Sequence, residues 1–267
     1  MKAVFTFTSS ESKRLLAKAV ALLPEVQNAM KKGMIIIGAG TTNAFVLEEL
    51  TGQEVDKARY TVGITTRGRQ CITSEKERIA PVVLLDGEKS PMSWEEAVEK
   101  MGADDVFIKG GNAIDSSWTV GILLGHPLGG TIGKVLPIVA ARGSHLIMPV
   151  GLEKMIPSVY RAASISGIKV FDEAIGMRVG LMPVTAAQGL PITEIEALEI
   201  LADVNAYCIS AGGIGGSEGS VVMALAGEEQ EIEKIMELIK GIKGEPPIGA
   251  FKQKCSECKV QCSVMEK

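Results

Sequence analysis

The chain has 267 residues, of which 46% are hydrophobic and 4% aromatic, and its formal net charge is −4. This length can bury a sizeable core, and 30 glycines suit an α/β protein with many joints between strands and helices. The acidic balance argues against a general nucleic-acid binder, which needs a basic surface. The first ten residues lack the pattern of a signal peptide, and no uncharged stretch is long enough to span a membrane, so we expect a cytoplasmic protein.

The beginning of the chain predicts a strand, a helix and then an anion-binding loop. Residues 1–8 alternate like a short strand, and residues 13–23 carry apolar side chains at helical spacing. The apolar run Met34–Ile37 indicates a buried strand, and a Gly-Ala-Gly turn then leads into a helix. Such a turn leaves N–H groups unpaired at the positive end of a helix dipole, which suits phosphate, carboxylate or CoA. A plain strand-to-helix turn is the alternative. The residues expected to bind the anion are Gly38, Gly40, Thr41 and Thr42.

A polar, basic loop follows the strand predicted at residues 60–64. Arg67 in this loop either clamps an anionic ligand from a strand end, or belongs to a solvated loop or a salt bridge between subunits. Residues 81–85 predict another buried strand, and a helix is expected to start near Ser93.

The stretch 102–115 predicts a second part of the site. The strand Val106–Ile108 is preceded by Asp105 and ends in Lys109. Because ligands collect at the carboxyl ends of strands in α/β sheets, we expect this end to face the ligand. Lys109 would neutralise a phosphate or a developing enolate, and Asp105 would move a proton. The alternative is a turn aspartate and a surface lysine. The further expected ligand contacts are Gly110, Gly111 and Asn112.

Residues 33–50 together with the segment GADDVFIKGGNA, residues 102–113, resemble the ribose-5-phosphate isomerase branch of a known superfamily. That superfamily also contains glucosamine-6-phosphate deaminases, DeoR-type sensor domains and CoA transferases. In the isomerases a G-x-G-T loop holds the sugar phosphate, and the second segment supplies acidic and lysine residues beside the open-chain sugar. The resemblance implies these roles for Gly38, Gly40, Thr41, Thr42, Asp104, Asp105, Lys109, Gly110 and Gly111.

The sequence departs from the isomerases where their carboxylates stand. Met101 replaces an aspartate, and residues 116–119 read SSWT where the isomerases keep a catalytic glutamate. Proton transfer between C1 and C2 of a sugar needs that carboxylate. The resemblance therefore supports the fold and the anion site more than isomerase activity.

A second glycine-rich loop, residues 125–134, precedes a helix expected at residues 135–142. Lys134 stands three positions too late for a Walker A loop. The N–H groups of Gly129, Gly130 and Thr131 either cradle a second anionic group or only let helix and strand approach. His126 in this loop is a candidate acid–base residue. Glu153, beyond the strand 146–150, is the preferred general base of an enzyme, or else simply a helix-start residue.

The last third of the chain predicts a small subdomain and a cysteine-rich tail. A capped helix from Thr193, strands at residues 205–210 and 220–226 and a helix at 228–242 suggest the ferredoxin-like subdomain that the isomerases append for oligomer contacts. The glycine-rich turn 211–219 would lie over the ligand or across a subunit interface.

The run CSECKVQC near the end of the chain offers three thiolates at C-x2-C-x3-C spacing. This set suits a [4Fe–4S] cluster with one open iron, or zinc with an outside ligand. Cys71, Cys208 or another subunit would supply a fourth thiolate. Redox disulfides, or no role, are the alternatives. The three candidate ligands are Cys255, Cys258 and Cys262.

These patterns predict a doubly wound, mostly parallel α/β sheet in residues 1–180, a small α+β subdomain in 181–243 and a cysteine-rich tail in 244–267. The leading hypothesis is an enzyme, an isomerase, lyase or transferase, that acts on a phosphorylated or CoA-linked small metabolite. Lys109 would act as an electrostatic clamp, and Asp105, Glu153 or His126 would handle protons. The alternatives are a metabolite-sensing or regulatory protein with the same anion site, and an iron–sulfur enzyme centred on the tail. We expect a homo-oligomer that binds neither nucleic acid nor membrane.

Overall fold

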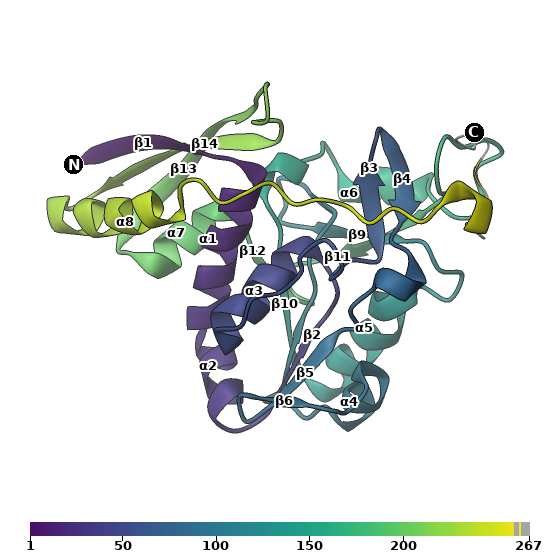
Figure 1. Ribbon diagram of the computed structural model, residues 1–267. Coiled ribbons are helices and arrows are strands. Elements are labelled where there is room, and N and C mark those ends of the chain that lie inside the picture. The colour runs from purple at the N-terminus through teal and green to yellow at the C-terminus, as the bar shows by residue number, and fades with distance from the viewer. Residues whose placement is uncertain (259–261, 263–267) are drawn as a thin grey trace.

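A six-stranded mixed sheet lies at the centre of the computed structural model, which describes residues 1–258 and 262 (Figure 1). Its order is β12-β10-β7-β2-β5-β6, in which the first four strands run parallel and the last two are antiparallel. The α/β class is as predicted. The sheet is mixed, because β5 and β6 at one end of it pair in antiparallel fashion. The strands are β2 (Met34–Ile37), β5 (Val82–Leu85), β6 (Glu88–Ser90), β7 (Val106–Ile108), β10 (His145–Pro149) and β12 (Leu190–Ile192).

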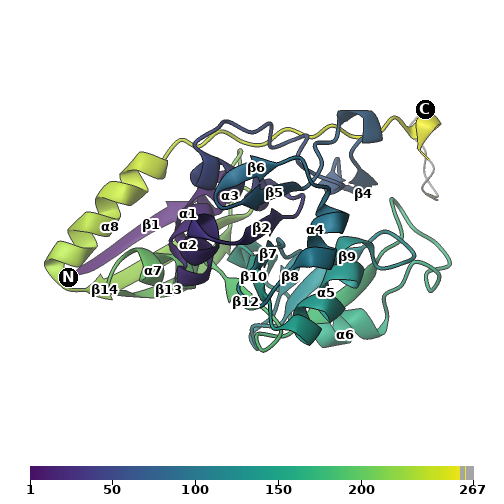
Figure 2. The same ribbon diagram turned by 90° about the horizontal axis from the view of Figure 1, so that it is seen from below.

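Both faces of the central sheet are buried, which explains why its inner strands are continuous apolar runs. In β2, Ile35 and Ile37 belong to one core and Ile36 to another, because successive side chains point to opposite faces. The first core includes three helices that cover one face of this sheet, besides the two helices of the small layer described below, and the second core includes two helices on the other face (Figures 1 and 2). These helices are α1 (Ser9–Leu22), α2 (Pro24–Lys31) and α3 (Thr41–Thr51) on the first face, and α4 (Trp94–Lys100) and α5 (Gly130–Arg142) on the second.

A small antiparallel sheet joins the two ends of the sequence. Its order is β1-β14-β13, with Lys2 opposite Ala226, and its core side chains pack against the last two helices. We expected a subdomain confined to residues 181–243, but β1 belongs to this layer while β12 belongs to the central sheet. The elements of this layer are β1 (Lys2–Phe7), α7 (Glu194–Leu201), β13 (Val204–Gly212), β14 (Ser220–Gly227) and α8 (Glu229–Ile242).

A third antiparallel sheet, β11-β9-β8, covers the second face of the central sheet together with α4 and α5. Strand β11 pairs with β9 across the whole length of both strands, so residues 180–184 form part of this sheet and not of the small layer. The elements are β8 (Ala113–Ile114), β9 (Val120–Leu124), α6 (Val159–Ser164) and β11 (Gly180–Val184).

Local signals set the helix starts. Capping boxes begin α1 at Thr8 with Glu11 and α7 at Thr193 with Glu196, the latter as predicted. Helix α5 begins at Gly130, five residues earlier than expected, so much of the second glycine-rich loop is helical. No helix among residues 1–258 is both long and apolar enough to cross a membrane.

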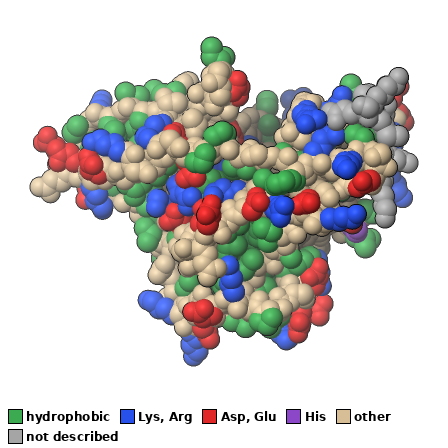
Figure 3. Space-filling model, viewed as in Figure 1, with side chains coloured by type: hydrophobic (Ala, Val, Ile, Leu, Met, Phe, Trp, Pro, Cys, Tyr) green, Lys and Arg blue, Asp and Glu red, His purple; other side chains and the backbone are tan. Residues whose placement is uncertain are grey.

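A β3–β4 hairpin and the C-terminal tail lie beside the central sheet. The tail leaves α8 and runs past α3 to this hairpin in both views (Figures 1 and 2). Arg14 fastens the start of the tail to α1 and α3 through ion pairs with Glu245 at 2.9 Å, Glu48 at 2.6 Å and Glu49 at 2.9 Å. Charges of both signs are interspersed on this face (Figure 3). The elements are β3 (Gly63–Thr66), β4 (Arg69–Ile72) and the short 3-10 turns η1 (Glu75–Glu77), η2 (Leu152–Lys154) and η3 (Cys255–Glu257).

Candidate functional site

Several loops meet at one edge of the central sheet, where the parallel strands β2, β7, β10 and β12 end. We call this the carboxyl edge. Gly38 follows β2, Lys109 follows β7, Gly151 follows β10 and Glu194 lies just beyond β12. The strands are parallel neighbours, so their carboxyl ends come together in space although their sequences are far apart. Charged side chains gather at this edge.

Lys109 packs over the glycine turn that follows β2. A Cβ built on Gly38 would lie 3.4 Å from Cδ of Lys109, so the lysine stem crosses the turn closely. Burial lowers the pKa of Lys109 from 10.5 to about 8. The side chain nevertheless keeps part of its surface open to solvent. No hydrogen bond or ion pair engages its ammonium within the part of the chain that the structure describes, which leaves it available to a ligand.

Lys154 brings a second ammonium to the same place. Its Nζ donates a 2.9 Å hydrogen bond to the carbonyl oxygen of Gly111, and burial lowers its pKa from 10.5 to about 8. Four neighbouring charges shift this pKa further: two lysines lower it and two glutamates raise it. These neighbours are Lys13, Glu153, Glu194 and Lys109. We call these four residues, together with Lys154, the charged cluster of the carboxyl edge.

Asn43 is fully buried in the first turn of α3. Its Nδ2 donates to the carbonyl oxygens of Gly38 at 2.7 Å and Ile108 at 3.1 Å. Because both of these partners are acceptors, the amide nitrogen must face them and Oδ1 points the other way. Oδ1 has no hydrogen-bond partner within residues 1–258, and a Cβ built on Gly110 would lie 3.7 Å from it. A buried acceptor is therefore left unpaired beside the Lys109 loop.

Glu194 is completely buried at the start of α7. One carboxylate oxygen, Oε2, accepts a 2.8 Å hydrogen bond from the N–H of Leu152, while Oε1 has no partner in the described residues. Burial raises the pKa of this carboxyl, and the nearby charge of Glu153 raises it further. The buried hydroxyl of Ser12 beside it also lacks a partner of good geometry. A buried carboxyl with an open oxygen is suited to proton transfer.

Glu153 forms the outer side of the cluster. Its Oε1 lies 3.4 Å from Nζ of Lys13, which also donates to the carbonyl oxygen of Ser9 at 3.0 Å. The glycine-rich turn between β13 and β14 lies against this carboxylate, since a Cβ on Gly219 would come within 2.5 Å of Oε2. Gly219 also has a φ of +77°, so both space and backbone favour glycine there.

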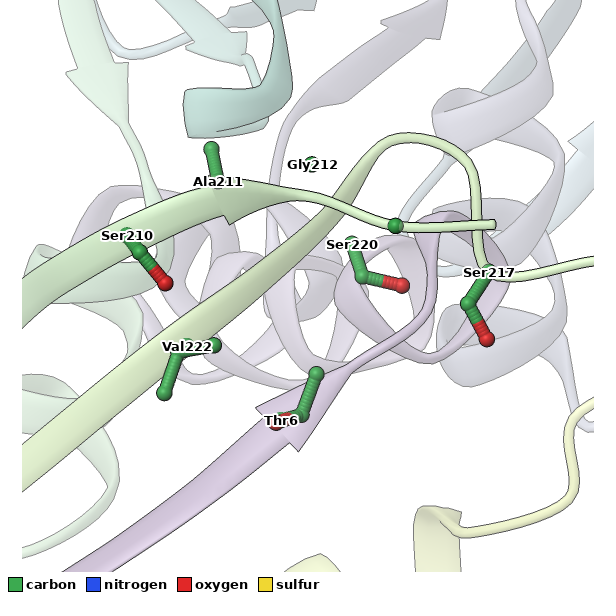
Figure 4. A pocket seen from close by; sticks show the side chains of 8 residues that line it. Thr6, Ser210, Ala211, Gly212, Ser217, Ser220 and Val222 are labelled. Carbon is green, nitrogen blue, oxygen red and sulfur yellow. The ribbon is translucent and has the colours of Figure 1, made fainter. Parts of the chain in front are cut away.

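An open depression of about 230 Å³ lies under the same turn (Figure 4). Hydroxyl groups of β1, β13 and β14 line it, and the Ser220 hydroxyl has no partner within residues 1–258. The depression contains none of the charged side chains of the cluster, so it adjoins the carboxyl edge without being part of it. The lining residues are Thr6, Ser210, Ala211, Gly212, Gly213, Ser217, Ser220 and Val222.

The glycine turn after β2 differs in detail from an amide cradle. The N–H of Gly38 donates to the carbonyl oxygen of Ile108 at 2.9 Å, and that of Gly40 to Tyr60 at 2.7 Å. These two amides are therefore used within the protein. Gly40 caps α3 without a side chain, so an anion at this turn would meet the N–H groups of Thr41 and Thr42 instead.

Asp105 lies at the opposite end of β7 from Lys109. Its carboxylate accepts hydrogen bonds from the N–H of Met34 at 2.8 Å and of Gly102 at 2.6 Å. The expectation that it works beside Lys109 is wrong in position, because the whole strand β7 separates the two. Asp105 serves the turn that precedes the strand.

The residues after Lys109 have structural contacts. The Gly111 N–H donates to the carbonyl oxygen of Pro149 at 3.2 Å, and Oδ1 of Asn112 accepts from the N–H of Leu123 at 3.0 Å. These bonds join β7 to β10 and β9. The segment thus holds Lys109 in place, and Gly110 is its residue nearest to the open Asn43 oxygen.

The second glycine-rich loop joins β9 to α5. His126 is exposed, and its Nδ1 accepts from the N–H of Leu128 at 3.2 Å. Lys134 pairs with Glu99 of α4 at 3.1 Å. None of the contacts in the described structure joins this loop, with Gly129, Gly130 and Thr131, to the charged cluster. Arg67 lies on the exposed turn of the β3–β4 hairpin, with a φ of +51°.

Sequence reasoning missed four members of the site: Lys13, Asn43, Lys154 and Glu194. Lys154 and Glu194 each follow a parallel strand of the central sheet, and that position was the one available signal.

The chain is a mixed α/β protein, and its candidate site carries lysine and glutamate side chains at the carboxyl edge of the central sheet. No protein-family model, curated protein or solved structure matches it.

Proposed function

We propose that this protein is an enzyme that acts on a small anionic metabolite, phosphorylated or CoA-linked, by proton transfer at the carboxyl edge. The observation that carries the proposal is the pairing of two deep ammonium groups, Lys109 and Lys154, with two buried acceptor atoms that have no partner within residues 1–258. These acceptors are Asn43 Oδ1 and Glu194 Oε1. A doubly wound arrangement of the sheet, as the sequence suggests, would use this same edge for its ligand.

The binding side of the proposal follows from unsatisfied groups. A buried acceptor without a partner costs about 1–3 kcal/mol, and a ligand hydroxyl or amine that donates to it removes this cost. An ammonium held away from water likewise favours an anionic partner. A ligand with an anionic group for Lys109 and the start of α3, and with donors for Asn43 and Glu194, would satisfy both requirements. Sugar phosphates, phosphorylated acids and hydroxyacyl-CoA esters have this combination.

The chemical side uses Glu194 as the base. In its ionised form, the open oxygen Oε1 would take a proton from a carbon next to a carbonyl group. The electron pair of that C–H bond would form a double bond to the carbonyl carbon, and the π pair of the carbonyl would move to its oxygen, where a lysine ammonium would stabilise the enolate. In an isomerisation, the proton of a hydroxyl group on the first carbon moves to the enolate oxygen, and Glu194 returns its proton to the former carbonyl carbon. In an elimination, the enolate re-forms the carbonyl group and expels a leaving group from the carbon on the other side of the deprotonated one. Glu153 fits this role less well because Lys13 already pairs with it at 3.4 Å.

We also propose that the enzyme works as a cytoplasmic homo-oligomer. The outer face of the small sheet carries Val4, Tyr207 and Ile209, which are 63%, 55% and 59% exposed. Apolar side chains gathered on an open sheet face are typical of a subunit contact. This agrees with the expectation that the small layer, like a ferredoxin-like subdomain, serves contacts between subunits. Size-exclusion chromatography with light scattering of the wild type and of Ile209→Asp tests this part, which fails if the wild type is monomeric.

The decisive experiment follows both binding and proton exchange. Wild type and variants are incubated in D₂O with a panel of sugar phosphates, phosphorylated acids and acyl-CoA esters, and deuterium incorporation is followed by NMR while affinity is measured by calorimetry. Glu194→Gln should lose about 10²–10⁴-fold in exchange rate, as expected for a general base. Lys109→Met should weaken binding by about 1–3 kcal/mol.

The matched control is Lys32→Met, which changes an exposed lysine away from the carboxyl edge. It should behave as the wild type in both measurements. Saturable binding with no exchange or turnover in the wild type would replace the enzyme by a metabolite sensor with the same site. Unchanged affinity in Lys109→Met would remove the site itself.

A further inference from the structure

The cysteine-bearing tail docks on the β3–β4 hairpin, next to Cys71. Lys252 forms an isolated antiparallel β-bridge with Thr73 through the backbone. The N–H of Gln253 donates to the carbonyl oxygen of Ile72 at 2.9 Å. The N–H of Ser74 donates to the carbonyl oxygen of Phe251 at 3.1 Å. The tail thus lies beside β4 (Figure 1), the strand in which Cys71 directly precedes Ile72.

The last described cysteine approaches the same strand from a different segment. Gly176 forms a parallel bridge with Gln70, the residue before Cys71, and the N–H of Met177 donates to the Gln70 carbonyl oxygen at 2.8 Å. The N–H of Gly176 in turn donates to Sγ of Cys262 at 3.3 Å. Cys262 is thus held by Gly176, which forms a β-bridge with the residue next to Cys71 in the sequence.

The other two tail cysteines lie at the two ends of a single turn. Cys255 and Cys258 enclose the turn η3, in which the N–H of Cys258 donates to the Cys255 carbonyl oxygen at 3.2 Å. Nζ of Lys252 lies 3.2 Å from Sγ of Cys255. Ammonium and amide donors aimed at sulfur, from Lys252 here and from Gly176 at Cys262, are the contacts that stabilise thiolate ligands.

These backbone contacts bring the tail cysteines to the strand that bears Cys71. The fifth cysteine, Cys208, lies on β13 in the small sheet.

We propose that Cys71 completes a four-thiolate metal site with Cys255, Cys258 and Cys262, and that the metal fastens the tail to the β3–β4 hairpin. Four cysteines are the ligand set both of structural zinc and of a [4Fe–4S] cluster. In residues 1–258 and 262, no three His, Cys, Asp or Glu side chains stand close enough to hold a metal ion. Metal binding would therefore have to draw the thiols together, on a backbone already held by the tail contacts.

The experiment uses the full chain purified without oxygen, with metal analysis, sulfide analysis and visible absorbance. We expect one zinc ion or one iron–sulfur cluster per chain, and the visible absorbance of the cluster distinguishes the two. Cys71→Ser should lose at least ten-fold in bound metal, as should Cys258→Ser. Cys208→Ser is the matched control and should retain the full content. Circular dichroism checks that each variant is folded.

A second readout follows the tail itself. Removing the metal by chelation should speed trypsin cleavage at Lys252 or Lys254 by ten-fold or more in the wild type, and the cleavage in Cys71→Ser should be fast without chelator. Full metal content in Cys71→Ser together with its loss in Cys258→Ser would overturn the proposal, because the site would then use only the tail cysteines. Absence of metal from the anaerobic wild type, even after addition of zinc or of iron and sulfide, would also overturn it.

Discussion

Replacing Lys109 by methionine should stabilise the folded protein at neutral pH while removing the ligand contact proposed for this side chain. Burial lowers the pKa of Lys109 from 10.5 to about 8, and one pKa unit corresponds to about 1.4 kcal/mol. Keeping this ammonium charged in the folded protein therefore costs up to about 3 kcal/mol at pH 7. Because the side chain keeps some exposure, solvent screening reduces this, and we expect a gain of about 1–3 kcal/mol in the free energy of unfolding.

The pH dependence carries a sign that identifies the cause. Between about pH 8 and pH 10.5 the unfolded chain binds a proton at Lys109 that the folded protein has released. The wild-type free energy of unfolding therefore gains a contribution that rises with pH in this window. The stability advantage of Lys109→Met should be full at pH 7 and should shrink towards zero near pH 10.5. Lys109 also lowers the pKa of Lys154, so its replacement relieves part of the cost of charging Lys154 and adds to the advantage with the same sign and in the same pH range.

Urea denaturation of the wild type, Lys109→Met and Lys32→Met at several pH values measures this difference. Lys32 is exposed, so its replacement should change the free energy of unfolding by no more than about 0.5 kcal/mol. A Lys109→Met protein that is less stable than the wild type at pH 7 would refute the reasoning. So would an advantage that does not change with pH, because a charge cost must disappear when the charge does.

Three further predictions concern the same edge. Binding of a phosphorylated ligand, measured by calorimetry, should weaken as pH rises above about 8, because Lys109 and Lys154 then lose their protons; constant affinity to pH 9.5 would contradict their role. Gly111→Ala should cost about 1–3 kcal/mol in thermal or urea unfolding, since its Cβ would lie 2.6 Å from a valine methyl group, whereas Gly241→Ala on α8 meets open space and should stabilise by up to about 1 kcal/mol. Glu194→Gln should keep the hydrogen bond from the Leu152 N–H and raise stability at neutral pH, because burial raises the pKa of this carboxyl; a loss of several kcal/mol would show that its charge is paired.

Local patterns predicted the β2–turn–α3 unit and the strand before Lys109. The apolar run Met34–Ile37 with its glycine turn is such a signal, and Val106–Ile108 is another. The rule that ligands lie at carboxyl ends of strands then gave Lys109 its position. The same rule argues against Asp105, which precedes the strand although it is close to Lys109 in sequence.

The rest of the cluster depends on strand order, which local patterns do not contain. Lys154 follows β10 and Glu194 follows β12, and only the order β12-β10-β7-β2 brings both to Lys109. In sequence, Glu194 is an ordinary acidic residue in the first turn of a helix, and Lys154 an ordinary polar loop residue. Their burial arises when the loops meet. In sequence, Asn43 is an ordinary polar residue in the first turn of a helix, although its amide is what joins the β2 and β7 loops.

The pairing of β1 with β14 has a consequence for how the protein is made. Lys2 lies opposite Ala226, so the first strand leaves the ribosome long before its neighbour is synthesised. During that interval its hydrogen-bonding edge and Phe7 have no native cover, which invites pairing with other nascent chains. The order of synthesis and the order of assembly are thus opposed in this layer. A truncated chain that stops before residue 220 should accumulate in inclusion bodies or on chaperones, even though every strand of the central sheet is present.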